Sequence, residues 1–320
     1  MNILLTGGAG FIGSNIVPAL LDDTRVDKLV VLDNLVTGKR ENIEPYIGNN
    51  KFEFVKGDIC DFQLCNELCK EIDIISHQAA LGSVPRSIND PISTNEVNIN
   101  GFLNILVAAK ENKVKRVVFA ASSSTYGDST ALPKQEDIIG KPLSPYAVTK
   151  YVNEVYADVF RKTYQLPFIG LRYFNVFGPL QDPDSYYSAV IPLFCKAIIE
   201  NKDIMVNGDG SISRDFTYID NVVRINKLAL FSHNPEALNK IYNVACGNGN
   251  TIKYLAEQLI KISGSGIGIQ FGPPRLGDIA HSLADISRAR KYLQYEPTVS
   301  FEDGLNITWE YYKKVLGNRQ

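Results

Sequence analysis

The sequence predicts an α/β protein in which a doubly wound parallel sheet is joined to a second, smaller lobe. Up to about residue 172, short apolar runs alternate with segments of helical period, the pattern of a parallel sheet covered by helices on both faces. A glycine-rich turn follows the first apolar run and leads into a helical segment. Beyond residue 172, prolines and glycines break the chain into shorter elements, so a separate lobe is expected there.

The elements of the first lobe follow from the positions of these runs. The expected strands are Asn2–Thr6, Lys28–Asp33, Lys51–Lys56, Ile72–His77, Arg116–Ala121 and Phe168–Arg172. The expected helices are Phe11–Leu21, Phe62–Lys70, Thr94–Asn112 and Tyr146–Tyr164. The stretch Asp215–Phe231 has the pattern of a strand and a helix, so we expect a segment near residues 215–240 to return to the first lobe, residues 1–172. The smaller α/β lobe, residues 173–320, would then be discontinuous.

Composition excludes several classes of protein. The 33 basic residues are matched by 35 acidic ones in mixed order, which argues against a nucleic-acid partner. No stretch approaches the roughly 18 apolar residues of a membrane helix, and a strand-like run follows Met1 directly, so we expect a cytoplasmic protein. Five cysteines without framework spacing fit a reducing compartment. No metal site is expected, because Cys60, Cys65 and Cys69 have no histidine nearby.

The glycine-rich turn has the spacing of a dinucleotide-binding site. Gly7, Gly10 and Gly13 would permit a tight turn and a close approach of the backbone to a pyrophosphate at the start of a helix. Asp33 stands twenty residues later, where a carboxylate binds ribose hydroxyls and repels a 2′-phosphate, which favours NAD over NADP. A glycine turn without a ligand would leave this spacing to coincidence. The cofactor residues predicted here are Gly7, Gly10, Phe11, Ile12, Gly13, Asp33 and Asn34, with Asp58 and Ile59 beside the adenine.

A second constellation indicates acid–base chemistry. Tyr146 and Lys150 are four residues apart at the start of a helix, so both side chains share one face. We expect the ammonium to lower the pKa of the phenol, which is ordinarily about 10, toward neutrality. The fifth strand runs into a serine cluster that could supply a further hydrogen bond. Such a pair alone is more often a surface pair, but its place opposite this cluster favours a catalytic site.

Together these motifs resemble the extended short-chain dehydrogenase/reductases that act on nucleotide sugars. The resemblance rests on the glycine turn, the serine cluster with Tyr126-Gly127, Tyr146-x-x-x-Lys150 and the segment 171–178, LRYFNVFG. It is strongest to the bacterial UDP-N-acetylglucosamine 4-epimerases, in the segments 143–146, LSPY, and 281–285, HSLAD. It spans nearly the whole chain.

The resemblance implies roles for further residues. Ser122 matches the catalytic serine or threonine, so the implied catalytic residues are Ser122, Tyr146 and Lys150. Ala79 and Ala80 lie in a loop that matches the one between nicotinamide and sugar, and Asn98 and Tyr173 match cofactor-side positions that support the site. Tyr146 and Lys150 are expected to contact the cofactor as well. An ordinary polar residue of its helix is the alternative for Asn98. The implied substrate contacts are Gly82, Ser83, Ser123, Ser124, Asn175, Arg214, Arg275, Asp278 and Ser282, of which the two arginines would clamp a diphosphate.

The same resemblance narrows the reaction. Related dehydratases carry Asp-Glu after the catalytic threonine and decarboxylases keep a glutamate there, whereas this chain has Ser123-Ser124, so C4 epimerisation is the simplest outcome. The small Ser282 and Gly82 predict room for a 2-acetamido group, and hence interconversion of UDP-GlcNAc and UDP-GalNAc. A serine in an ordinary turn remains the alternative for Ser282.

Other functions stay open. A UDP-glucuronate decarboxylase or an epimerase of N-acetylated uronic UDP-sugars would share this fold, and a non-catalytic NAD-sensing regulator would lack the Tyr/Lys pair that this chain keeps. The nucleotide base is undetermined, because bases are usually bound by backbone groups. A homodimer through the helices Thr94–Asn112 and Tyr146–Tyr164 is expected from the family.

Overall fold

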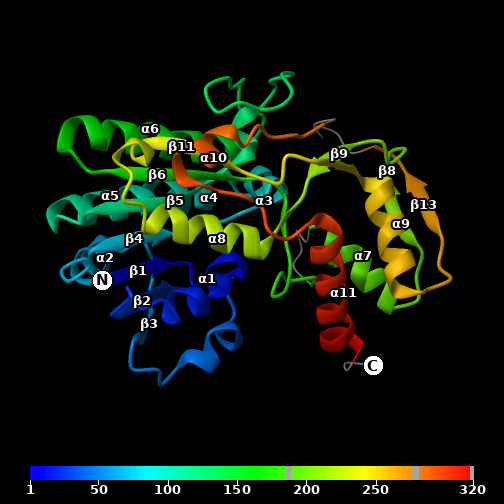
Figure 1. Ribbon diagram of the computed structural model, residues 1–320, viewed down its shortest axis with the longest axis horizontal. Helices are drawn as coiled ribbons and strands as arrows, with labels where there is room; N and C mark the ends of the chain where they lie inside the picture. The colour runs from blue at the N-terminus through cyan, green and yellow to red at the C-terminus, as the bar shows by residue number, and fades with distance from the viewer. Residues whose placement is uncertain (185–188, 275–280, 318–320) are drawn as a thin grey trace.

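The computed structural model describes residues 1–184, 189–274 and 281–317, and its larger part is built on one seven-stranded sheet (Figure 1). All neighbouring strands are parallel, in the order β11-β6-β5-β4-β1-β2-β3. This confirms the predicted doubly wound sheet. The strands are β1 (Asn2–Thr6), β2 (Lys28–Asp33), β3 (Phe52–Lys56), β4 (Ile74–His77), β5 (Arg116–Ser122), β6 (Phe168–Tyr173) and β11 (Lys240–Val244).

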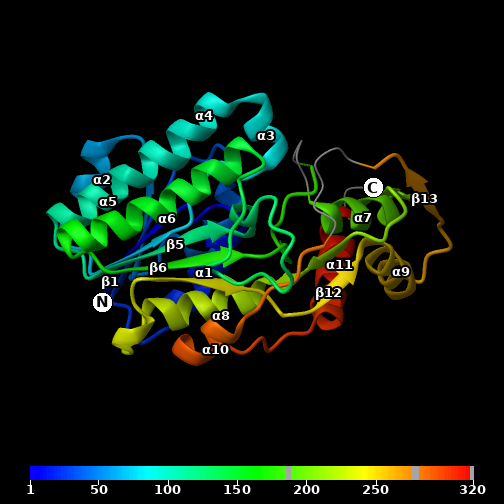
Figure 2. The same ribbon diagram turned by 90° about the horizontal axis from the view of Figure 1, so that it is seen from above.

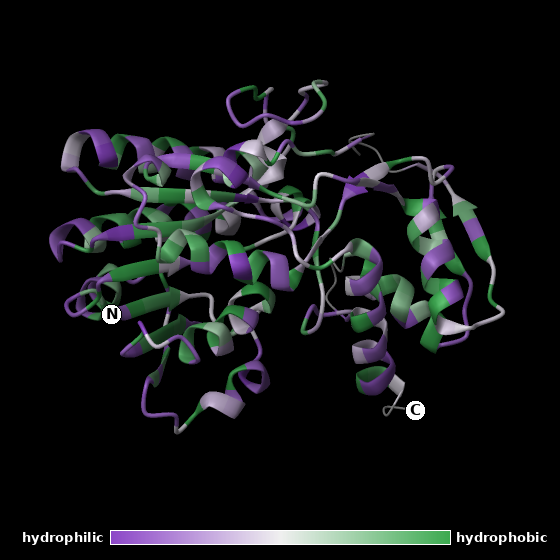
Figure 3. Ribbon diagram, in the orientation of Figure 1, coloured by the Kyte–Doolittle hydropathy of each residue, from purple (hydrophilic) through white to green (hydrophobic). Residues whose placement is uncertain are grey.

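Helices cover both faces of this sheet (Figure 2). One face carries α2 (Phe62–Leu68), α5 (Phe102–Glu111) and α6 (Pro145–Tyr164), and the other carries α1 (Phe11–Leu21), α8 (Ile219–Leu230) and α10 (Ser287–Leu293). Successive strand residues alternate between two buried apolar clusters, so that Leu4 packs with the first group of helices and Leu5 with the second. Burial on both faces explains why the strands are almost continuously hydrophobic (Figure 3).

The predicted helix Thr94–Asn112 is wrong as a single element. The structure has α4 (Pro91–Asn95), then a π-helical segment at Glu96–Gly101, and then α5. A π segment inserts extra residues into the turn and commonly lies at a functional site. Here it turns Asn98 inward and sets Gly101 so close to Ile59 that an added Cβ would lie 2.6 Å from Ile59 Cδ1.

The chain enters and leaves the smaller lobe more than once. After β6 it forms β7 (Val176–Phe177), α7 (Val190–Ile199), β8 (Ile204–Asn207), β9 (Ser213–Asp215) and β10 (Thr217–Tyr218). It then supplies α8, which contacts α1, β4 and β5, and β11, which pairs with β6. The lobe resumes with β12 (Gly249–Thr251), α9 (Ile252–Ser263), β13 (Ile269–Gly272) and α11 (Phe301–Gly317). The strand β11 was not predicted from the sequence.

Within the described ranges, no helix has both the length and the apolar character that crossing a bilayer requires.

Candidate active site

The glycine turn between β1 and α1 lies directly against the end of β4. Gly7 has φ +72°, and a Cβ there would lie 2.6 Å from Ala79 N, so no other residue fits without displacing the backbone just after β4. A Cβ on Gly13 would lie 2.2 Å from Gly7 O. At the N-cap of α1, Gly10 has no side chain to occupy the free N–H groups of the first turn. The turn therefore presents backbone donors and the helix dipole to an anion.

The carboxylate of Asp33 is held rigidly at the end of β2, beside this turn. Its Oδ2 accepts a hydrogen bond from Ala9 N at 2.9 Å, and its Oδ1 accepts one from Leu35 N at 2.8 Å. Each oxygen keeps a lone pair for a ligand hydroxyl. The position suits a ribose at the far end of a dinucleotide whose pyrophosphate lies on the glycine turn.

A cleft of about 260 Å³ runs along these elements. The glycine turn and the Asp33 carboxylate that line it suit the pyrophosphate and a ribose of NAD. Asp58 does not line the cleft, but its Oδ2 accepts a hydrogen bond from Asn34 Nδ2 at 2.8 Å, so it orients a lining residue. The predicted cofactor residues that line the cleft are Gly7, Gly10, Phe11, Ile12, Gly13, Asp33, Asn34, Ile59, Ala79 and Ala80, together with the predicted substrate contact Gly82.

Asn98 fixes the loop that follows β4. It is 1% exposed, its Oδ1 accepts a hydrogen bond from Leu81 N at 2.8 Å, and its Nδ2 donates to Thr149 Oγ1 of α6 at 3.1 Å. The loop ends at Ser83, whose φ of 127° is unusual for a residue with a side chain, and whose Oγ accepts from Arg86 N at the start of α3 (Val84–Asn89). Asn98 thus ties the cofactor cleft to the helix that carries Tyr146.

The serine cluster and helix α6 meet at the end of β5. Ser144 caps α6 by accepting a hydrogen bond from Ala147 N at 3.1 Å, which starts the helix one residue before Tyr146. Ser122 ends β5 and caps a 3-10 turn, Ser123–Tyr126, by accepting from Ser124 N at 3.1 Å. Ser124 Oγ donates to Ser122 Oγ at 2.9 Å. Ser122 lies on the side of Tyr146, where its hydroxyl acts to lower the pKa of the phenol.

The expected effect of Lys150 on Tyr146 is wrong for this arrangement. Burial raises the pKa of Tyr146, and the hydrogen bond with Ser122 only partly opposes that rise. The ammonium of Lys150 lies 6.0 Å from the centre of the Tyr146 ring and donates instead to Ala120 O at 2.9 Å. Its own burial lowers the pKa of Lys150 to about 8. The ammonium of Lys150 is therefore near Tyr146, but its hydrogen bond goes to the carbonyl of Ala120 and not to the phenol.

Tyr173 has a partner that the sequence did not reveal. Its hydroxyl donates to Gln78 Oε1 at 3.0 Å and also contacts Asn226 of α8. Gln78 lines the cofactor cleft directly after β4. The signal available in the sequence was the position of Gln78 immediately before Ala79, at the carboxyl end of a parallel strand, where ligands bind in sheets of this kind.

The smaller lobe contains a second cavity, of about 680 Å³, that brings Asn175 and Arg214 together. Phe177, Phe216 and residues of α7 complete its walls. Arg214 Nη1 donates to Ser213 O at 2.9 Å. Ser282 contacts the residue that precedes Arg214, because Ser282 N donates a hydrogen bond to Ser213 O at 3.1 Å. The predicted contacts Arg275 and Asp278 lie outside the described residues.

A parallel sheet with this glycine turn, this acidic residue after β2 and a Tyr/Lys helix beside a strand-terminal serine defines a short-chain dehydrogenase/reductase. The chain belongs to the NAD dependent epimerase/dehydratase family, whose model matches residues 3–245. Membership confirms the predicted resemblance to the extended group of these enzymes and the prediction that the cofactor is NAD.

Three relatives show how closely the chain follows the family. It is 36% identical to a UDP-glucose 4-epimerase of Mycolicibacterium smegmatis over 98% of this chain and 99% of that protein. It superposes with TM-score 0.92 on a UDP-N-acetylglucosamine 4-epimerase from Methanobrevibacter ruminantium M1 in complex with UDP-N-acetylmuramic acid, at 39% identity over 98% of both chains. It superposes equally well, at TM-score 0.92 and 34% identity, on a UDP-glucuronic acid 4-epimerase from Bacillus cereus with UDP-glucuronic acid and NAD, covering 98% and 100% of the two chains.

The glycine turn can be tested by binding alone. We expect Gly10→Ala to weaken NAD binding by at least about tenfold, because its methyl group would stand where the backbone must approach a pyrophosphate. The melting temperature should change little, since an added Cβ meets only Gly7 O, at 3.3 Å. Calorimetric titration with NAD measures the loss. Gly266→Ala is the matched control, because its Cβ would meet nothing within 4 Å; equal affinities in both variants would contradict the assignment.

Proposed function

We propose that this protein catalyses NAD-dependent C4 epimerisation of UDP-sugars, with Tyr146 as acid and base. The single observation that carries the proposal is the placement of the partly buried Tyr146 beside the end of β5, where Ser122 acts on its phenol, with the ammonium of Lys150 6.0 Å from its ring. Relatives named as UDP-sugar 4-epimerases, matched over nearly their whole length, support it.

Bound NAD supplies a hydride acceptor and donor. Tyr146 would take the proton of the C4 hydroxyl as the hydride leaves C4, and would return it after the 4-keto sugar has rotated. Ser122 would hydrogen-bond the same hydroxyl and stabilise the phenolate. Lys150 would keep a positive charge near the phenolate from a site that excludes water, where electrostatic effects are strong.

The 3-10 turn Ser123–Tyr126, which follows Ser122 and is called the serine turn below, argues against elimination or decarboxylation. Dehydration would need an acid and a base next to the sugar, whereas Ser123 and Ser124 are neutral and Ser124 Oγ is already bonded to Ser122 Oγ. Without carboxylates there, return of the hydride to the opposite face of the ketone is the simplest completion. Asn175 and Arg214, which share the second cavity, are proposed to hold the UDP moiety, with Arg214 on the diphosphate.

We infer that the preferred pair is UDP-GlcNAc and UDP-GalNAc. Gly82 supports this, because a Cβ there would have no atom within 4 Å, so the loop leaves open space beside the cofactor cleft. Ser282, a small residue next to the strand of Arg214, supports it too. An N-acetylated uronic UDP-sugar is the second candidate, favoured by the similarity to the UDP-glucuronic acid 4-epimerase of Bacillus cereus. UDP-glucuronate decarboxylation remains the alternative reaction.

A homodimer is proposed as the working assembly. Helix α6 exposes an apolar stripe, Val148, Tyr151, Val155 and Val159, each between 37% and 46% exposed. Their spacing of three or four residues places them along one side of the helix. Because such a stripe is costly in water and suits helix packing across a two-fold axis, a second copy of this chain is the proposed occupant.

The reaction is tested by supplying UDP-GlcNAc, UDP-GalNAc, UDP-Glc, UDP-Gal and the uronic forms to the NAD-loaded protein, without added reductant, and identifying products by NMR. We expect C4 epimers from the wild type. In Tyr146→Phe, kcat should fall by about 100-fold or more, because the proton acceptor is lost, while NAD affinity stays unchanged. Tyr164→Phe, at the end of the same helix, is the control. A Tyr146→Phe variant with normal turnover would show that another group carries the proton.

The acetyl preference is tested at Ser282. We expect Ser282→Tyr to reduce kcat/KM for UDP-GlcNAc by at least about tenfold relative to UDP-Glc, because the ring fills the volume proposed for the acetamido group. Ser282→Ala separates volume from the loss of the hydroxyl and should leave the preference unchanged. An unaltered ratio of the two substrates in Ser282→Tyr would refute the role of Ser282 in specificity.

The dimer is tested by light scattering. We expect Val155→Glu to yield a monomer at micromolar concentration, because a charge would be buried in the apolar contact. Glu302→Gln, at an exposed position of α11, is the control. A wild-type monomer, or a dimer that persists in Val155→Glu, would rule out this surface.

A further inference from the structure

The serine turn is clamped at its far end by Tyr126. This side chain is 1% exposed, and the guanidinium of Arg172 lies 4.8 Å from the centre of its ring. The carbonyl of Tyr126 accepts hydrogen bonds from Gly140 N at 3.0 Å and Ser129 N at 3.1 Å. Its hydroxyl donates to Asn243 Oδ1 at 2.6 Å. The turn that begins at Ser122 is therefore fixed at both ends, by β5 and by the side chain of Tyr126.

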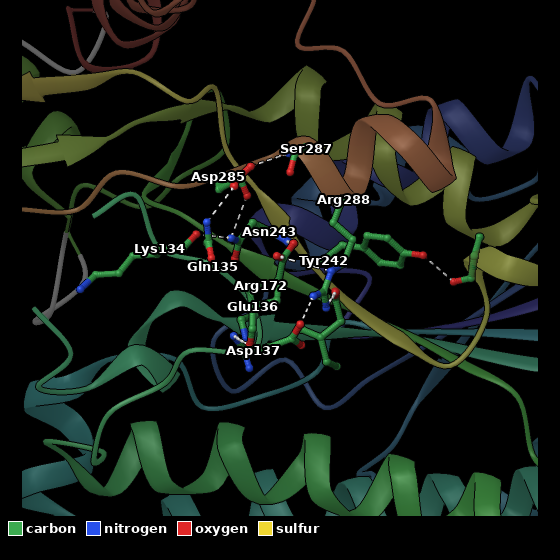
Figure 4. Close-up of polar contacts among 12 residues, drawn as sticks. Lys134, Gln135, Glu136, Asp137, Arg172, Tyr242, Asn243, Asp285, Ser287 and Arg288 are labelled. Carbon is green, nitrogen blue, oxygen red and sulfur yellow. Dashed lines mark hydrogen bonds and ion pairs between the residues drawn. The ribbon is translucent and has the colours of Figure 1, made fainter. Parts of the chain in front are cut away.

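Asn243 joins this turn to two segments that are distant in the sequence. It lies on β11, in register with Arg172 of β6. Its Nδ2 donates to Lys134 O at 2.8 Å and to Asp285 O at 3.0 Å, and Figure 4 shows these residues converging around it. The amide of Asn243 thus uses its acceptor for Tyr126 and both of its donors for the other two segments, so it has one preferred orientation.

The segment around Asp285, which Asn243 binds, also contacts β9, the strand that carries Arg214 of the proposed diphosphate site. Ala284 N donates to Asp215 Oδ2 at 3.2 Å, and Ser282 N donates to Ser213 O at 3.1 Å. These two contacts lie on either side of Arg214. The buried carboxylate of Asp215 also accepts from Cys246 N at 3.0 Å and from Gly247 N at 3.1 Å, just after β11. A continuous set of hydrogen bonds therefore runs from the strand of Arg214 to Tyr126.

We propose that Tyr126 and Asn243 are positioning residues, and that their hydrogen bond sets Ser122 against Tyr146 from the side of the substrate lobe. This inference rests on the proposed function. The 3-10 turn between Ser122 and Tyr126 is short and internally bonded, because Ser124 N and Gly127 N close it at 3.1 Å each. A shift of Tyr126 is consequently passed to Ser122 instead of being absorbed between them.

A purely structural role for the bond predicts a different result. Removing a structural hydrogen bond lowers the melting temperature and leaves the chemistry of the remaining folded enzyme intact. Removing a positioning bond lowers kcat in enzyme that is still folded, since a small misplacement near reacting atoms is costly. The binding of UDP should be almost unaffected in either case, because Arg214 keeps its own contacts.

The sharpest variant is Tyr126→Phe, which deletes one oxygen and keeps the ring under Arg172. We expect kcat for UDP-sugar epimerisation to fall by about tenfold with KM within about twofold. The control is Tyr242→Phe: this neighbour on β11 is also buried, and its hydroxyl donates to Ala237 O at 2.7 Å, away from the serine turn. It should lose stability without a loss of kcat.

The pH profile supplies a second readout. The hydrogen bond with Ser122 opposes the raised pKa of Tyr146, so loosening it should move the limb of kcat that rises with pH to higher pH. The other charged or titratable groups nearby are Lys150, Glu154 one turn further along α6, and His77 at the end of β4, which burial keeps neutral. Tyr126→Phe changes none of these three directly; it does remove the hydroxyl beside Arg172, which keeps its bidentate pair with Glu154.

The outcomes separate this inference from the proposed function. If the wild type epimerises no UDP-sugar, the proposed function fails. If it does, and Tyr126→Phe keeps wild-type kcat and pH profile, the inference is wrong. Should Tyr126→Phe not fold, kcat and the pH profile are measured in Asn243→Ser, and wild-type values there would equally overturn the inference. If both single variants fold, the double variant should be no slower than Asn243→Ser, because the hydroxyl acts through the amide.

Discussion

Two buried cations hold the active-site helix on the sheet, and the rest of the site depends on them. Lys150 donates to Ala120 O of β5, and Arg172 of β6 forms a bidentate pair with Glu154 of α6, with N–O distances of 2.8 Å and 2.6 Å. Breaking a buried pair of this kind costs about 3–5 kcal/mol. Helix α6 therefore cannot slide or rotate relative to β5 without stranding a charge, and Tyr146 stays opposite Ser122.

The sheet order explains where the cofactor cleft opens. Strands β1 and β4 are neighbours, and the connection that leaves β1 runs through α1 on one face whereas the connection that leaves β4 runs through α5 on the other (Figure 2). The loops after β1 and β4 consequently separate, which leaves a crevice at their carboxyl ends. Gly7 is in van der Waals contact with the backbone after β4 at the bottom of this crevice, and Asp33 marks its outer end.

The substrate lobe is also built at the carboxyl ends of the sheet strands. Because the chain contributes α8 and β11 between β10 and β12, the segments that carry Arg214 and Ser282 are attached to β11 and its end: Asp215 binds Cys246 N, and Asp285 O binds Asn243. Asp215 is the centre of this attachment, and its burial raises its pKa to about 6 in spite of the backbone donors around it. Burial disfavours a charged carboxylate, so its presence here indicates that the hydrogen bonds it accepts are needed to hold these segments in place.

The sequence by itself determined the parts that depend on local spacing. Six strands, the glycine turn and the i, i+4 relation of Tyr146 and Lys150 are local patterns, and the structure reproduces their positions, with strand ends moved by at most two residues.

The tertiary structure alone decided what depends on distant partners. Strand β11 is short and unremarkable in sequence, and only pairing with β6 defines it. The π segment contains Asn98, which bonds Leu81 of a distant loop, and Lys150 donates to Ala120 O, a carbonyl that only the folded sheet brings near it. Asn243 shows the physical reason most plainly: the three partners of its side chain come from residues 126, 134 and 285, and no local pattern can encode a bond between segments that meet only after folding.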